Sequence, residues 1–434
     1  MKRNHICFCI VLLLLFIFPK IPTESINLPT ASSISLGFIG LVGWAIISPR
    51  YLLFYLNNLK ERGVFSVINL PFLFSCYIIV TSLLSENFIS LIYAIQYSLY
   101  LILSIALFSG YFNEVFRLNQ SHYLFNIISW ISLIFSIGAI VSIFTGPIYP
   151  HQVITPLRTL ENNIYFPRAI GFTENANFTG GILIVFFAFN WFLYSRKRFQ
   201  KFWNILEFTA LLMTISRSAI LSIIAAFLFY TFLRLFFAKI LDKRIFMLLI
   251  IIPFVILFVL TIMLLFLDES ITSNLIGSFG FGGDYRIDSD TDERLGLWNN
   301  GLQNWLNGNG FQIIFGQGFR NSFSTTGIAW ETPHNLYIAM LGDFGIAGIL
   351  LFVSPLIFVL LQTSIDICRI KKPGIESFTM VSLLGLLIHN GTEVFFYSPV
   401  IMSLAVIVIT LYTQRYEVQN KHFSLLSHSF NIKI

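Results

Sequence analysis

Apolar residues form a succession of long runs, separated by short polar segments, over most of the chain. A helix needs roughly 20 apolar residues to cross the hydrocarbon core of a bilayer, and many of the runs approach that length. The first run has no small-residue cleavage site soon after it, so we interpret it as an uncleaved span. The apolar windows are 6–18, 31–48, 64–85, 88–112, 124–146, 176–195, 202–216, 218–237, 245–267, 335–362, 377–396 and 398–413. The pattern predicts an all-α polytopic membrane protein with about twelve transmembrane helices.

Two polar segments are longer than simple turns, namely residues 147–175 and 268–333. No internal repeat, low-complexity tract or soluble domain accompanies them. Residues 1–434 are therefore predicted to form a single integral membrane domain, with a smaller and a larger loop on the same side.

The larger loop contains one stretch of helical periodicity. Leu295, Trp298, Leu302, Trp305 and Leu306 recur at helical spacing. They follow Asp290-Thr291-Asp292-Glu293, which resembles a helix N-cap with a capping-box partner, and precede Asn307-Gly308-Asn309-Gly310, which stops a helix. The pattern predicts an amphipathic helix at the outer mouth of the protein, with Arg294 and Trp298 on one face.

Composition agrees with the membrane class and excludes a soluble globular domain. The chain is 56% hydrophobic and 11% charged, and its mean hydropathy is +0.78. The net charge of +6 does not indicate nucleic acid as a partner, because no basic stripe is interleaved with aromatic residues. The four cysteines lie in or beside apolar segments and have neither a disulfide pattern nor metal-ligand spacing.

The basic residues predict the orientation of the chain. If both termini are cytoplasmic, most of the 27 basic residues fall on the inner side, as the positive-inside rule requires. The loops 147–175 and 268–333 are then periplasmic. The basic residues left on the outer side are Lys20, Arg158, Arg168, Arg217, Arg286, Arg294 and Arg320.

The outer basic residues are nearly all arginine, which suggests planar, bidentate recognition of phosphate or carboxylate groups. The alternative is ordinary ion pairing with the outer acids, and we favour it for Arg158, Arg286 and Arg320. Arg217 lies between two apolar runs that are barely separated, at or slightly within the membrane. An arginine there costs a few kcal/mol unless it faces an aqueous cavity, an anion or lipid headgroups.

Pro333 and His334 close the large loop and precede the apolar window 335–362. The positive end of that helix dipole favours the neutral imidazole, which can accept a proton. The alternative is a histidine that merely caps the helix. Asp343 lies about two turns into the same helix. Two interpretations are open: Asp343 shares a cavity with His389, Asn390 and Glu393, or these groups only pair with one another.

Metal binding is not predicted. Asp288-Ser289-Asp290 matches a short Asp-x-Asp pattern, and Asp292 extends the alternation of acids. The glycine and the distal glutamate of a calcium loop are missing. Acids in an acidic loop are usually just solvated.

Taken together, these motifs resemble those of the O-antigen polymerase and O-antigen ligase superfamily of bacterial envelope glycosyltransferases. The resemblance covers about residues 160 to 395. It rests on the order and common side of Arg168-Ala169-Ile170-Gly171-Phe172, Ser216-Arg217, Arg294-Leu295-Gly296-Leu297-Trp298, Gly316-Gln317-Gly318, His334-Asn335-Leu336-Tyr337 and Gly345-Ile346-Ala347-Gly348. Relatives often carry Asn-Pro-Asn where this chain has Asn175-Ala176-Asn177.

The resemblance implies a metal-independent, inverting glycosyltransferase that works at the periplasmic face of the bacterial inner membrane without a cofactor. Its donor would be an undecaprenyl-diphosphate-linked glycan. His334 would be the base, and Arg217 and Arg294 would hold the diphosphate. Arg168, Asn335, Asp343 and Trp298 are predicted to bind substrate.

Three functions remain open on the sequence. A polymerase, which we favour as the more varied branch of the superfamily, transfers the glycan to another lipid-linked repeat unit. A ligase transfers it to a lipid A–core saccharide. A flippase is disfavoured because the charge lies at the outer mouth rather than along a path through several helices. Expected partners are membrane lipids, a chain-length regulator and a flippase.

Overall fold

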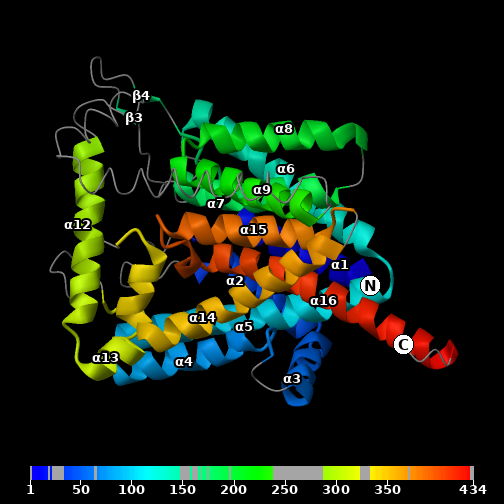
Figure 1. Ribbon diagram of the computed structural model, residues 1–434, viewed down its shortest axis with the longest axis horizontal. Helices are drawn as coiled ribbons and strands as arrows, with labels where there is room; N and C mark the ends of the chain where they lie inside the picture. The colour runs from blue at the N-terminus through cyan, green and yellow to red at the C-terminus, as the bar shows by residue number, and fades with distance from the viewer. Residues whose placement is uncertain are drawn as a thin grey trace.

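The structure is a computed structural model that describes residues 2–17, 20–21, 34–62, 66–146, 157–158, 165–166, 168–173, 175–194, 197–237, 287–322, 333–369 and 372–430. Its long helices run side by side as a bundle (Figure 1). One helix, α12, lies across the helix ends on one side of the bundle, and both chain termini lie at the other side (Figure 1). These two sides are named the α12 end and the terminal end.

Helices occupy most of the described part of each apolar window, and the window 245–267 lies outside the described residues. The helices are α1 (Lys2–Phe16), α2 (Leu36–Ile47), α3 (Arg50–Arg62), α4 (Leu70–Leu84), α5 (Phe88–Arg117), α6 (Ser121–Thr145), α7 (Ala176–Leu193), α8 (Lys197–Met213), α9 (Arg217–Phe237), α12 (Ile287–Leu306), α13 (Gly310–Phe315), α14 (Leu336–Arg369), α15 (Ile375–Asn390), η3 (Phe395–Tyr397) and α16 (Pro399–Phe430). Two antiparallel pairs of two-residue strands join β1 (Lys20–Ile21) to β2 (Ile34–Ser35) and β3 (Leu157–Arg158) to β4 (Tyr165–Phe166).

The helical membrane class is confirmed, whereas the expected number of spans is not. Among the described residues, five helices are long and apolar enough to cross a membrane: α5, α6, α7, α9 and α14. A sixth span results if α2 and α3, which meet at 87°, are counted as one broken span. Helices such as α4 and α15 are apolar but shorter than a full span. The prediction of about twelve spans is therefore not confirmed.

The interior of the bundle is built from large side chains that interlock. Helix α5 packs against α4 and α16, and α15 packs against both α7 and α9. Near the terminal end, the ring of Phe8 contacts those of Trp44, Phe108, Tyr111 and Phe112, with centroid separations between 4.8 and 6.0 Å. Aromatic pairs at these separations add to the stabilisation from packing. They fix α1 against α2 and α5.

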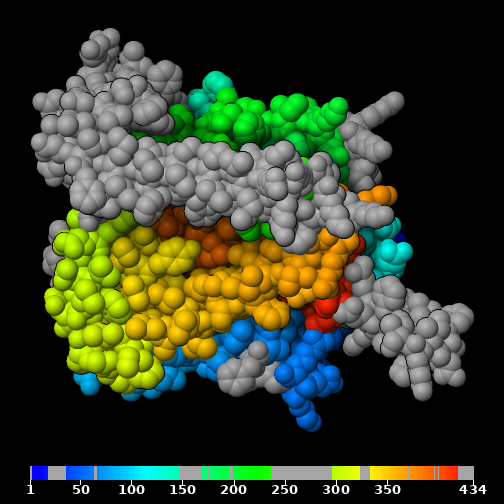
Figure 2. All heavy atoms as spheres, viewed as in Figure 1, coloured from blue at the N-terminus to red at the C-terminus, as the bar shows by residue number. Residues whose placement is uncertain are grey.

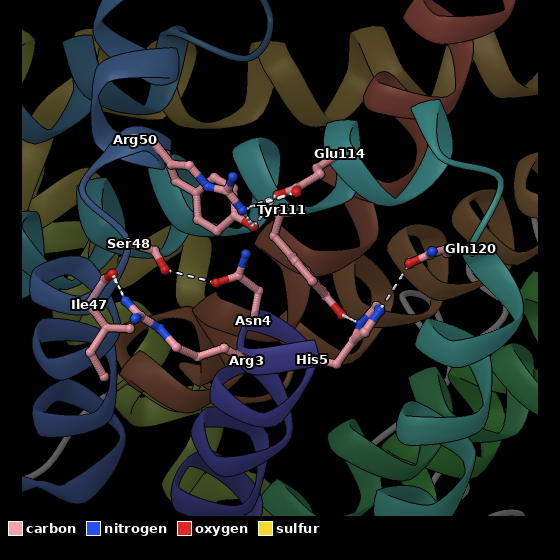
Figure 3. A network of polar contacts seen from close by, with 10 residues as sticks. Arg3, Asn4, His5, Ile47, Ser48, Arg50, Tyr111, Glu114 and Gln120 are labelled. Carbon is pink, nitrogen blue, oxygen red and sulfur yellow. Dashed lines mark hydrogen bonds and ion pairs between the residues drawn. The ribbon is translucent and has the colours of Figure 1, made fainter. Parts of the chain in front are cut away.

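Polar contacts hold the helix ends together at the terminal end (Figure 3). Ser48 Oγ donates to Asn4 Oδ1 (2.9 Å). The two ring nitrogens of His5 lie 2.5 Å from Tyr111 OH and 3.3 Å from Gln120 Oε1. Arg50 Nη2 lies 2.7 Å from Glu114 Oε2. The predicted first span is thus tied to α2, α5 and α6 by its polar residues.

At the α12 end, α12 and α13 border the surface beside α14 (Figure 2). Helix α12 begins at Ile287, so Asp290 lies inside the helix and is not the N-cap that we predicted. Its end at Leu306 confirms the predicted stop. Asn309 then caps α13 with a full capping box to Gln312.

Helix α14 is interrupted at Gly345, whose φ of 62° is a left-handed conformation. The chain after α13 packs against this break. The backbone N–H of Gln317 donates to the carbonyl of Gly342 (3.0 Å), and that of Gly318 donates to the carbonyl of Asp343 (2.9 Å). A Cβ at Gly316 would lie 2.2 Å from the Asp343 oxygen, and one at Gly345 would lie 2.4 Å from the Ile314 oxygen. Two backbones meet here without room for a side chain.

Candidate active site

A chain of hydrogen bonds at the α12 end joins residues that are far apart in sequence. His334 Nδ1 lies 3.2 Å from Glu393 Oε2, and Asn177 Nδ2 donates to Glu393 Oε1 at 2.6 Å. Asn177 Oδ1 accepts from Arg168 Nη2 at 2.8 Å, and Arg168 Nε donates to the carbonyl of Thr214 at 2.8 Å. The structure thus brings the predicted His334 and Arg168 into one network, through Glu393 and Asn177.

Glu393 is positioned by the turn that follows α15. Asn390 Oδ1 accepts from the backbone N–H of Phe396 (3.2 Å), and Thr392 Oγ1 donates to the carbonyl of His389 (3.0 Å). His389 Nε2 lies 3.1 Å from the carbonyl of Asn177, which holds the end of α15 against the start of α7. The turn therefore fixes the carboxylate next to Asn177.

The two members of the His334–Glu393 pair differ in exposure. The side chain of His334 is 41% exposed and that of Glu393 only 6%. A carboxylate that accepts from one ring nitrogen of a histidine fixes its tautomer and leaves the other nitrogen able to accept a proton. With Nδ1 bonded to Glu393, this nitrogen is Nε2. The pair suits a general base whose reactive side faces solvent.

His334 does not cap α14. Asn335 does so, because its Oδ1 accepts from the backbone N–H groups of Tyr337 (3.0 Å) and Ile338 (3.3 Å). His334 lies outside the helix with a φ of 44°. This left-handed conformation costs a non-glycine residue about 1–2 kcal/mol. Strain of this kind is concentrated at functional sites.

Arg217 is the first residue of α9 and is exposed, at the turn between two apolar helices as predicted. The same turn carries the carbonyl of Thr214 to which Arg168 donates, and the N–H of Ala169 donates to the carbonyl of Met213 (2.8 Å). Arg168 and Arg217 therefore belong to one structural unit, formed by the α8–α9 turn and the segment before α7.

Helix α12 carries Arg294 and Trp298 to the same end. A Cβ at Gly301 would lie 2.7 Å from the Ile338 side chain and 3.6 Å from that of Pro333, so α12 crosses next to His334. The side chain of Arg294 lies outside the described residues. That of Trp298 is half-buried, and within the described part of the chain its indole Nε1 has no hydrogen-bond partner.

Asp343, which is predicted to bind substrate, lies in a hydrogen-bond network with Arg320, Ser322 and Tyr397. It is fully buried, and its carboxylate accepts from the N–H of Arg320 (2.8 Å), the N–H and Oγ of Ser322 (3.1 and 2.6 Å) and the hydroxyl of Tyr397 (2.8 Å). Burial raises the pKa of Tyr397 well above its ordinary value, so this hydroxyl stays protonated and donates. Asp343 therefore holds the turn 319–322 in place, whereas Glu393 is the carboxylate that orients His334.

The sequence places Glu393 in a possible cavity with Asp343, and Asn177 enters only in the comparison with relatives. It gives neither residue a role beside His334. No group of three or more His, Cys, Asp or Glu residues placed to hold a metal ion occurs within the described ranges. The side chains of Asp288, Asp290 and Asp292 lie outside them, so the expectation for these residues stays a prediction.

Residues 202–353 match the family model described as O-antigen ligase. No curated protein matches the chain. The matched stretch runs from α8 into α14 and includes Arg217, Arg294 and His334, while Arg168 and Glu393 lie outside it. The predicted resemblance to the O-antigen polymerase and ligase superfamily is confirmed over this stretch.

Proposed function

Because residues 202–353 match the O-antigen ligase family, we propose that this multi-pass membrane protein is a glycosyltransferase of the O-antigen polymerase and ligase superfamily. The observation that carries the proposal is the His334–Glu393 pair, which lies in one hydrogen-bonded network with Arg168. A base, its orienting carboxylate and nearby arginines are the groups that transfer from a diphosphate donor requires.

In the proposed reaction, His334 Nε2 takes the proton of an acceptor hydroxyl. The hydroxyl oxygen forms a bond to the anomeric carbon of the donor glycan, while the bond from that carbon to the diphosphate oxygen breaks. The polyprenyl diphosphate leaves with the electron pair, and the anomeric configuration inverts. Glu393 stabilises the imidazolium that forms.

The arginines stabilise the leaving group. Arg217 and Arg294 hold the diphosphate, because guanidinium groups offer paired donors to phosphate oxygens. Arg168 is held by Thr214 and Asn177, so it fixes the α8–α9 turn relative to Glu393 and helps hold the glycan or the diphosphate. Neither a metal nor a cofactor enters this proposal.

We place the α12 end at the periplasmic face of the bacterial inner membrane and both termini in the cytoplasm. The basic residues at the terminal end support this orientation, among them Arg3, Arg50 and Arg62. The donor is then an undecaprenyl-diphosphate-linked glycan presented from the outer leaflet. A chain-length regulator and a flippase are the expected protein partners.

We favour a polymerase, whose acceptor is a second lipid-linked repeat unit. The description of the matching family favours a ligase, whose acceptor is lipid A–core, as the second candidate. Deletion of the gene separates these functions. Core that bears a single repeat unit indicates a polymerase, bare core with accumulated lipid-linked polymer indicates a ligase, and precursor trapped on the cytoplasmic face indicates a flippase.

The base is tested by His334→Asn in purified protein with lipid-linked donor and acceptor. Asn335 supplies the cap, so the variant should fold and bind donor like the wild type. Asparagine tolerates the left-handed backbone but cannot take a proton. Turnover should therefore be lost. Near-normal turnover would refute the assignment of His334 as the base.

A further inference from the structure

The turn 316–322 is held from several sides at the α12 end. Phe319 donates its N–H to Ser82 Oγ (2.9 Å) and accepts from Ser90 Oγ through its carbonyl (2.8 Å). Asn87 Nδ2 donates to Asn321 Oδ1 (2.8 Å). Together with the bonds to Asp343, these contacts lock the turn between the α4–α5 corner and α14.

An arginine lies at the apex of this rigid turn. Arg320 has a φ of 58°, and its N–H is fixed by the buried Asp343. Its guanidinium lies 5.2 Å from the ring centroid of Tyr93 and 5.6 Å from that of Phe319, and the residue is exposed. Such stacking is a cation–π interaction. It restricts the position of a cation that remains exposed.

Ordinary ion pairing, which we expected for Arg320, is not observed among the described residues. In the described part of the chain, no carboxylate side chain contacts its guanidinium, and the only carboxylate bonded to Arg320 accepts from its backbone. The left-handed backbone of Arg320 and the burial of the Asp343 carboxylate both cost folding free energy. Because this free energy serves to position one surface arginine, we expect its cation to have a ligand.

The surface beside Arg320 is strongly apolar. At the α4–α5 corner, the exposed fractions reach 61% for Leu83, 57% for Leu84, 74% for Phe88 and 59% for Ile89. A fixed cation next to a hydrocarbon-like surface matches an amphiphile that has an anionic head and a long apolar chain.

Arg320 lies on a different side of the His334–Glu393 pair from Arg168 and Arg217. Arg168 and Arg217 belong to the unit of α7, α8 and α9, which lies on one side of α15, whereas α4 and α5 lie on the other (Figure 1). Arg320 is linked to the centre through Asp343, which also binds Tyr397, four residues after Glu393.

We propose that Arg320, supported on Tyr93, is a second anion-binding site that takes the diphosphate of the lipid-linked acceptor. This inference rests on the proposed polymerase function, since a ligase has no second polyprenyl diphosphate to bind. The two lipid-linked substrates then enter from opposite sides of His334. Each has its own arginine site for the diphosphate.

The test uses full-length protein in nanodiscs of zwitterionic lipid, titrated by calorimetry with sugar-free undecaprenyl diphosphate. Wild type should bind two equivalents and Arg320→Gln only one. Arg50→Gln is the matched control, because Arg50 is also an exposed arginine stacked on a tyrosine (5.1 Å to the Tyr51 centroid) but lies at the terminal end. It should bind two equivalents. Tyr93→Leu should weaken the second site at least about tenfold, since it removes the cation–π support but keeps the charge.

Kinetics provide an independent readout. Arg320→Gln should raise the acceptor KM at least about tenfold and leave the donor KM unchanged, because a lost hydrogen bond to a charged group costs about 1.5–3 kcal/mol. Circular dichroism and thermal unfolding check that the variants fold.

Several outcomes would overturn the inference. Binding of only one equivalent by wild type, or of two equivalents by Arg320→Gln, would each contradict it. Displacement of undecaprenyl diphosphate from the second site by phosphatidylglycerol at bilayer density would identify a lipid-headgroup site instead. An effect of Arg320→Gln confined to acceptors with acidic sugars would assign the cation to a glycan carboxylate instead. These results are separable from a failure of the proposed function, which is decided by the turnover of His334→Asn.

Discussion

His334 and Glu393 are 59 positions apart in sequence, yet Nδ1 of the histidine lies 3.2 Å from Oε2 of the glutamate. One residue precedes α14 and the other follows α15, so the pair connects the start of α14 to the end of α15. Its geometry directs Nε2 away from the carboxylate. Proton acceptance by His334 therefore depends on the turn that holds Glu393.

Replacing Glu393 by Gln tests this dependence. Glutamine retains the size, but its single terminal oxygen cannot accept from both His334 and Asn177, and it cannot stabilise an imidazolium. We expect kcat to fall about 10- to 100-fold, as for other residues that orient a functional histidine, with donor binding unchanged. Glu417→Gln, at the terminal end where Glu417 pairs with Arg62, is the control. Equal kcat values for the two variants would contradict the orienting role of Glu393.

Replacing Asn335 by Ala tests the cap of α14. Loss of an N-cap side chain costs about 1 kcal/mol, so the unfolding transition should move to lower temperature or denaturant concentration. Asn335→Asp should restore the stability, because aspartate caps equally well. An alanine variant with wild-type stability but no substrate binding would instead support the substrate-binding role predicted for Asn335.

Replacing Arg217 and Arg294 individually by Lys tests the recognition of diphosphate. Lysine keeps the charge but offers a point donor in place of a planar fork. We expect turnover to fall at least about tenfold in each variant, since hydrogen bonds to charged groups contribute about 1.5–3 kcal/mol. Arg234→Lys, in the last turn of α9, should keep wild-type turnover. Full activity of Arg217→Lys and Arg294→Lys would show that charge alone suffices.

Replacing Asp288, Asp290 and Asp292 together by Asn tests the role of the acidic stretch. We expect substantial activity to remain, and chelators should not abolish the activity of wild type. Activity that is lost on chelation and restored strictly by a divalent ion would show that the Asp-x-Asp pattern binds a metal.

Reporter fusions test the orientation. Fusions after Arg198, Lys243 and Lys372 should report cytoplasm, and fusions within 270–330 should report periplasm, because basic loops stay on the cytoplasmic side. A cysteine at Ser289 should be labelled from the periplasm. Labelling from the cytoplasmic side alone would place the proposed site on the wrong face.

Much of the helical framework follows from the apolar pattern, because each run must satisfy its own backbone hydrogen bonds. The pattern does not fix where a run crosses the membrane. Helix α3 is an example: residues 50–62 lie in a segment predicted to be an inner loop, yet they form a helix at 87° to α2. The break at Gly345 could not be predicted either, because an apolar run gives no sign of a change of φ at one glycine.

The site was predictable only in part. His334 could be proposed because it lies at a boundary between polar and apolar sequence, and Arg168 because it is one of the outer arginines and belongs to a motif of the resemblance. The role of Glu393 depends on how α15 packs against α7 and α14, which is a long-range property that no local spacing encodes. Asp343 was expected to share a cavity with His389, Asn390 and Glu393 because it lies about two turns into the helix after His334, whereas packing directs its carboxylate to the turn 319–322.

The contact between Gly316 and Gly345 has a consequence for how such proteins diversify. Because two backbones touch there without side chains, the contact is independent of the sequence on either side of it. Changes in the polar loop before Gly316 that leave the packing of α12 and α13 intact thus keep its point of attachment to the bundle the same. Variation in the sugars that an enzyme of this kind recognises would then be concentrated upstream of that glycine, and a loop exchanged between two such enzymes would be joined most safely at this seam.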